Sequence, residues 1–128
     1  MCVGAAPARA WRTTNLARVH VELLFWADCP SHPRALADLR AALAAEGLDP
    51  DAIVLREITT EAEAAWEGFV GSPTIRIDGV DVQDPGKEPA GLTCRVFRRR
   101  DGRISPTPDP QDLRDAITAA SSIERSSR

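Results

Sequence analysis

The sequence has few cysteines, no long apolar run and no strong excess of charge. Its three cysteines, Cys2, Cys29 and Cys94, are too few and too widely spaced for a disulfide scaffold. The longest apolar stretch, around 21–27, is far too short to cross a bilayer, so no membrane partner is expected. Acidic and basic residues are mixed, and the net charge of -3 argues against a nucleic-acid partner.

The two ends of the chain lack the periodic patterns of the middle. Residues 1–18 show neither periodicity nor the apolar segment of a secretory signal, which predicts a disordered N-terminal tail. Residues 121–128 are predicted to form a flexible C-terminal tail. The remaining residues, 19–120, suffice for one domain with one core. Without an export signal the expected location is the cytoplasm, where a cysteine pair is more often reactive or metal-binding than structural.

Hydrophobic patterns within 19–120 predict the element order β-α-β-α-β-β-α. Strands are expected at 19–26, 53–58, 74–78 and 93–98, and helices at 31–46, at 60–69 and from 109 onward. Apolar residues at helical spacing mark the first helix (Leu36, Leu39, Leu43) and the last (Leu113, Ile117, Ala120). The capping-box spacing of Thr60 and Glu63 starts the second helix.

This order predicts an α/β fold in which helices flank a mixed four-stranded sheet. A right-handed crossover makes strands 19–26 and 53–58 parallel neighbours, with Ile53 and Leu55 facing inward and Val54 as a further candidate. Strands 74–78 and 93–98 are expected to pair as an antiparallel hairpin. The segment 80–92 between them is long and rich in Pro, Gly and Asp, as in mobile or functional loops. Trp26 and Trp66 are expected to pack in the core.

Cys29 is the first candidate for chemistry. It follows the first predicted strand and directly precedes the first helix, where unpaired amide groups and the helix dipole favour a thiolate. Pro30 and Ser31 suit the first turn of that helix. The alternative interpretation is that Cys29 is only a small apolar core residue, as free cysteines often are.

Two segments together resemble the thioredoxin-like superfamily. Residues 25–32, Phe-Trp-Ala-Asp-Cys-Pro-Ser-His, resemble the active-site stretch of thioredoxins and glutaredoxins, and Ser72-Pro73-Thr74 resembles their cis-proline loop. The resemblance covers roughly 19–120 and implies a thioredoxin-like fold with a cis bond between Ser72 and Pro73. It also implies that Ser72, Pro73 and Thr74 receive an extended substrate beside Cys29. The alternative is a trans proline that starts an edge strand.

His32 departs from that resemblance, because it occupies the place of the second cysteine in the Cys-x-x-Cys motif. A mixed disulfide on Cys29 therefore has no second thiol within the motif to release it. His32 is a candidate to stabilise the Cys29 thiolate, or to act as an acid or base near neutral pH. The alternative is an exposed first-turn histidine without a role.

Cys94 allows two interpretations. In a simple hairpin it lies away from Cys29 as a buried structural cysteine, whereas the long loop 80–92 has the length to return it toward Cys29. A weaker resemblance favours the second: Thr93-Cys94-Arg95-Val96-Phe97 is similar to the second-cysteine segment of bacterial alkylmercury lyases. That resemblance implies a soft metal ion held by Cys29 and Cys94. The aspartate that protonates carbon in those enzymes corresponds to His32 here, so carbon–mercury cleavage is not expected.

Three functions follow from these residues. The favoured one is a monothiol thiol–disulfide oxidoreductase that acts through Cys29, with Cys94 or a small thiol resolving the intermediate. The second is a soft-metal or organomercury-binding protein that uses Cys29 and Cys94. The third is a binding module that keeps the fold without the chemistry. The expected partners are a protein or low-molecular-weight thiol or disulfide, or a soft metal ion, and no cofactor is expected.

Overall fold

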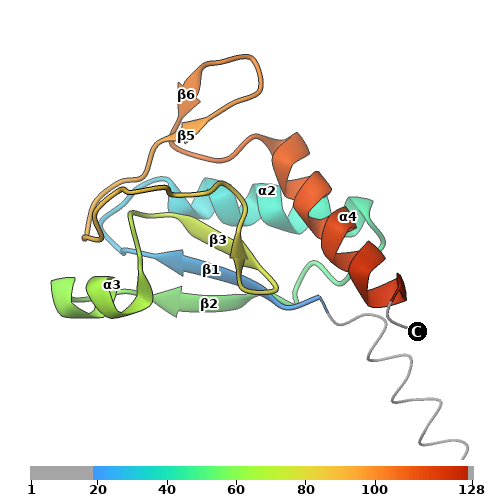
Figure 1. The fold of residues 1–128 in the computed structure, drawn as a ribbon, viewed down its shortest axis with the longest axis horizontal. Helices are drawn as coiled ribbons and strands as arrows, with labels where there is room; N and C mark the ends of the chain where they lie inside the picture. Colours follow the sequence, from blue (N-terminus) through green and yellow to red (C-terminus); the bar gives the residue numbers. More distant parts are fainter. Residues whose placement is uncertain (1–18, 127–128) are drawn as a thin grey trace, which may run out of the picture.

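The structure is a computed structural model that describes residues 19–126 (Figure 1). The predicted N-terminal tail, 1–18, lies outside the described residues, as do 127–128. The last helix, α4 (Pro110–Ser126), continues through a segment for which the sequence predicted a flexible tail from residue 121. Extension of a formed helix is easier than its nucleation, since each further residue adds one hydrogen bond.

A four-stranded mixed sheet forms the centre of the fold, in the order β2-β1-β3-β4. The central strand β1 (Val21–Phe25) runs parallel to β2 (Val54–Glu57) and antiparallel to β3 (Thr74–Ile77). The short strand β4 (Val80–Asp81) completes the sheet. The prediction of an α/β fold with a mixed four-stranded sheet is confirmed, and Figure 1 shows β1 between its neighbours.

The identity of the fourth strand was predicted wrongly. Residues 93–98 do not pair with β3; part of them forms β5 (Phe97–Arg98), which pairs with β6 (Ile104–Ser105) in a separate two-stranded ribbon. The position beside β3 belongs to β4, which follows it through a two-residue turn. Both turn residues, Asp78 and Gly79, have positive φ, as a tight hairpin requires. Because only two residues separate β4 from β3, closing the loop between them costs little entropy. β4 therefore pairs with β3 in preference to the distant segment 93–98.

Two buried clusters lie on opposite faces of the sheet, because successive residues of a strand point to opposite sides. On one face, Leu23 of β1 packs in a cluster with residues of α2 (His32–Ala45) and α4. The apolar stripes predicted for these helices supply Leu39, Leu43, Leu113, Ile117 and Ala120, with Leu36 partly buried. On the other face, Leu24 packs with Ile58, Ala64 and Phe69 around α3 (Glu61–Glu67), and Trp26 packs against them as predicted.

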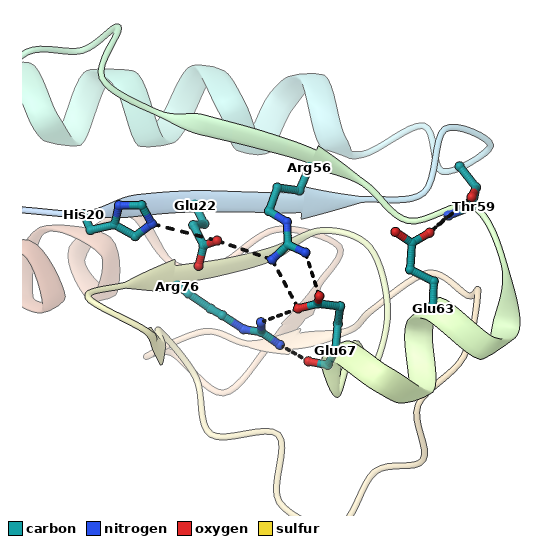
Figure 2. Close-up of polar contacts among 7 residues, drawn as sticks. All are labelled: His20, Glu22, Arg56, Thr59, Glu63, Glu67 and Arg76. Atoms are coloured by element: carbon teal, nitrogen blue, oxygen red, sulfur yellow. Dashed lines mark hydrogen bonds and ion pairs between the residues drawn. The ribbon is translucent and has the colours of Figure 1, made fainter.

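The face of the sheet on which α3 packs also carries a network of charged side chains, in a part that α3 covers incompletely (Figure 2). Arg56 of β2 lies between Glu22 of β1 and Glu67 of α3, and its Nη2 donates to Glu67 at 2.6 Å. Arg76 of β3 donates to the backbone carbonyl of Glu67, also at 2.6 Å. The hydrogen bond from Arg56 holds the pKa of Glu67 below its ordinary value. This network ties α3 to three strands.

The prediction that Trp66 packs in the core is wrong. The predicted start of α3 is correct: the Thr60 hydroxyl accepts from the Glu63 N–H at 3.0 Å, and the Glu63 carboxylate accepts from the Thr59 N–H. This short helix buries only one of its residues, Ala64. Trp66 is two positions further on, so it points to nearly the opposite side of the helix and is 87% exposed.

The burial predicted for Leu55, and for Val54 as a further candidate, is also wrong: β2 is an edge strand of the sheet, and these side chains are 53% and 43% exposed. Ile53 is partly buried against the first cluster, as predicted. In the segment 19–126 no helix combines the length and the apolar character needed to span a membrane.

Candidate functional site: a cysteine pair at the Ser72 loop

Cys29 lies in the loop between β1 and α2 and is fully buried. The turn is closed by its N–H, which donates to the Trp26 carbonyl at 2.9 Å. Its thiol donates to the backbone carbonyl of Ser72 at 3.3 Å. The residue therefore joins the start of α2 to the loop that precedes β3.

The environment of the thiol favours ionisation. Burial by itself raises the pKa of Cys29, but four hydrogen-bonding groups outweigh it and hold the pKa below the ordinary thiol value. The strongest of them is the Ser31 N–H at the start of α2; the hydroxyls of Ser72 and Ser31 and the thiol of Cys94 add to it. This outcome agrees with the placement of Cys29 before a helix, where amide groups stabilise a thiolate.

The Ser72 loop faces Cys29 as the sequence predicted. The peptide bond between Ser72 and Pro73 is cis, which confirms that prediction, and both residues are buried. The Ser72 hydroxyl is fully buried and has no hydrogen-bond partner among the described residues while Cys29 keeps its proton. A thiolate at Cys29 becomes an acceptor for this hydroxyl, which is why the hydroxyl lowers the pKa of the thiol.

Cys94 belongs to the same site, although 64 residues separate it from Cys29 in the chain. A parallel bridge pairs it with Ser72: the Ser72 N–H donates to the Thr93 carbonyl at 2.8 Å, and the Arg95 N–H donates to the Ser72 carbonyl at 2.9 Å. In Figure 1 this orange segment returns to the loop between β1 and α2. Cys94 is exposed, so the interpretation as a buried structural cysteine is wrong.

The two thiols act on each other in opposite directions. The pKa of Cys94 is raised, first by its hydrogen bond to Cys29, then by burial and by the charge of the Cys29 thiolate. The same hydrogen bond lowers the pKa of Cys29. Of the two thiols, Cys29 is therefore the one that ionises first, and Cys94 is the one that keeps its proton longer.

His32 does not contact the thiol through a hydrogen bond. Its Nδ1 lies 2.8 Å from the carbonyl oxygen of Cys29, so this nitrogen is the donor, and its ring stacks on Phe25 with the centroids 4.5 Å apart. His32 is not among the groups that lower the pKa of Cys29. Its observed role is to fix the backbone of the turn at the start of α2.

Two residues that sequence reasoning gave no role, Arg95 and Gly71, hold the Cys94 segment in place together with Thr74. Arg95 is buried; its guanidinium donates to Asp81 at 2.8 and 3.0 Å and lies over the Phe97 ring. Gly71 lies so close to Arg95 that a Cβ at Gly71 would be 2.9 Å from the Arg95 Cβ. Thr74, which is predicted to contact substrate, donates to the Gly71 carbonyl and accepts from Arg95. The one local signal for this cluster is the glycine directly before Ser72-Pro73.

Within 19–126, the cysteine pair has no third metal ligand arranged beside it. Among the described residues, no group of three or more His, Cys, Asp or Glu side chains is arranged to hold a metal ion. A four-coordinate zinc site therefore does not fit these residues, whereas an ion that accepts two thiolates does.

Comparison with known proteins finds no relative: no family model, no curated protein and no solved structure matches the chain.

Proposed function

We propose that this chain is a thioredoxin-like thiol–disulfide oxidoreductase whose redox unit is the pair Cys29 and Cys94. The observation that carries the proposal is that both cysteines meet at Ser72: the Cys29 thiol donates to its carbonyl at 3.3 Å, and Cys94 pairs with it in a backbone bridge. The lowered pKa of Cys29 supports it. The cis proline loop opposite Cys29 supports the thioredoxin-like assignment. Cys94 then supplies the partner thiol for Cys29 that the Cys-x-x-Cys motif lacks.

The chemistry is an exchange of one disulfide for another. The two protein thiols are oxidised to a Cys29–Cys94 disulfide, and an external disulfide is reduced to two thiols, so bonds and electrons balance. Reversal of the same steps by a small thiol or dithiol restores the reduced protein. Such a cycle suits the cytoplasm, where free thiols are kept reduced, and we place the protein there.

Mild oxidation of the protein tests this function. In a Cys2→Ser background, which removes the cysteine outside the described residues, we expect loss of both thiols and of two hydrogens from the mass, with the monomer size unchanged. Cys29→Ala and Cys94→Ala serve as matched controls and should each keep one thiol or bind one external thiol. Two persistent thiols in the parent protein, or a disulfide between two chains, would contradict the proposal.

A second function, binding of a soft metal ion, is favoured by one observation: two adjacent thiols without a third ligand among the described residues. Soft thiolates prefer ions such as Cu(I) or Hg(II). In an oxygen-free titration we expect one tightly bound ion per chain, and loss of that site in both Cys29→Ala and Cys94→Ala. His32→Ala should retain the site, since His32 contacts the Cys29 backbone only. Unchanged binding in Cys94→Ala would exclude this function.

A further inference from the structure

A cavity of about 390 Å³ opens beside Cys94. Its wall consists of Val70, part of the loop 83–89 and the segment 93–96. Cys94 lines the cavity, whereas Cys29 does not line it and is fully buried. The volume is at the lower end of the range for small-molecule sites. A small reagent that enters it therefore meets the sulfur of Cys94 before that of Cys29.

The charged side chains around this cavity are predominantly acidic. Asp84 and Glu88 line it and are exposed, and the Asp84 carboxylate is fixed by the Gly86 N–H at 2.9 Å. Among the described lining residues the one cation is Arg95, whose guanidinium is already paired with Asp81. Lys87 lies between the two carboxylates in sequence but does not line the cavity. The cavity therefore attracts a positive charge, and repels a negative one, close to Cys94.

We propose that this cavity is the substrate subsite of the cysteine pair and takes a small disulfide that carries an ammonium group near its sulfur, with the first bond formed at Cys94. The inference rests on the proposed redox function and adds the substrate class and the order of attack. A peptide-like disulfide with several carboxylates fits this acidic wall poorly.

The exchange proceeds through two successive substitutions at sulfur. The proton of Cys94 passes to the Cys29 thiolate, and the Cys94 sulfur attacks one sulfur of the substrate, whose disulfide breaks. The first half leaves as a thiolate and takes the proton from Cys29. The Cys29 thiolate then attacks the Cys94 sulfur, a Cys29–Cys94 disulfide forms, and the second half leaves as a thiolate that water protonates. Two protein thiols are oxidised, and one substrate disulfide is reduced to two thiols.

The test compares two small disulfides of opposite charge, cystamine and 3,3′-dithiodipropionate, at low and high salt. The measured quantity is the rate at which the reduced protein, in the Cys2→Ser background, loses its two thiols. Because the two reagents differ in intrinsic reactivity, the ratio of their rates is compared between variants. Asp84→Asn/Glu88→Gln should lower the cystamine preference about tenfold at low salt and by much less at high salt. Asp51→Asn/Asp101→Asn, which removes two exposed carboxylates that do not line the cavity, should retain the parent ratio.

The order of attack is tested by trapping the intermediate. Cys29→Ala treated with cystamine should hold one cysteamine on Cys94, as seen by mass spectrometry of its peptides. An adduct that forms on Cys29 in Cys94→Ala at the parent rate, with none on Cys94 in Cys29→Ala, would overturn the assigned order. An unchanged reagent ratio in Asp84→Asn/Glu88→Gln would overturn the cationic subsite, although the disulfide still forms. If neither reagent oxidises the pair, the redox function itself fails, and this inference with it.

Discussion

Gly71→Ala is expected to lower the free energy of unfolding by about 2–4 kcal/mol and to prevent the Cys29–Cys94 disulfide from forming. An added Cβ would lie 2.9 Å from the Arg95 Cβ and 3.0 Å from its Cα and backbone nitrogen. The φ of +145° at Gly71 adds strain for any residue with a side chain. Because the contact is with backbone, the segment that carries Cys94 has to move away from Ser72. Urea unfolding and the thiol titre after mild oxidation measure the two effects.

Gly47→Ala is the matched control for this substitution. Gly47 also has a positive φ, of +77°, but a Cβ there meets no atom within 4 Å. This control therefore carries backbone strain without the clash, at a cost of about 1 kcal/mol, and should leave disulfide formation intact. If the two variants lose equal stability and Gly71→Ala still forms the disulfide, the close approach of Gly71 to Arg95 is needed neither for stability nor for the meeting of the two cysteines.

Arg95→Met is expected to cost about 3–5 kcal/mol of folding free energy, because it leaves the Asp81 carboxylate largely buried without its partner. The guanidinium also donates to the Gln83 carbonyl and to the Thr74 hydroxyl, so several polar groups lose a donor together. The double variant Arg95→Met/Asp81→Asn should recover part of the loss, since it removes the unpaired charge. Urea unfolding of the single and double variants measures the loss of folding free energy and its partial recovery.

Arg98→Met is the control for this prediction, because Arg98 is exposed and only its backbone N–H bonds to the Gln83 side chain. A change within about 0.5 kcal/mol is expected there. A loss in Arg95→Met no larger than that of Arg98→Met would mean that the buried pair contributes nothing to stability. No recovery in the double variant would mean that the unpaired carboxylate is not the cause of the loss.

Features that depend on neighbours in sequence were predictable. The stripe of Leu36, Leu39 and Leu43 requires only the period of a helix, and the cap of α3 requires only Thr60 and Glu63. The parallel pairing of β1 with β2 followed from the right-handed crossover that connects them. The cis bond before Pro73 followed from the resemblance of a short motif at a fixed distance from Cys29.

Features that depend on distant contacts were not predictable. The exposure of Trp66 follows from how little of α3 the sheet covers, which no pattern within the helix reveals. The fourth strand was misplaced because the preference of β3 for its nearest segment outweighed the strand-like composition of 93–98. The meeting of Cys94 with Cys29 depends on a single bridge to Ser72 and on the close approach of Gly71 to Arg95. The sequence left that meeting open, and the acidic cavity beside it had no signal at all.

The carbonyl group of Ser72 accepts two donors at once, the Arg95 N–H and the Cys29 thiol. When Cys29 ionises or enters a disulfide, only the thiol donor is withdrawn, and the carbonyl keeps the amide donor. In the proposed redox cycle this buried carbonyl therefore keeps a donor at every step. We therefore expect the main-chain pairing around Ser72 to be the same in the dithiol and the disulfide form, so that oxidation changes the sulfur atoms and their immediate donors and leaves the backbone in place.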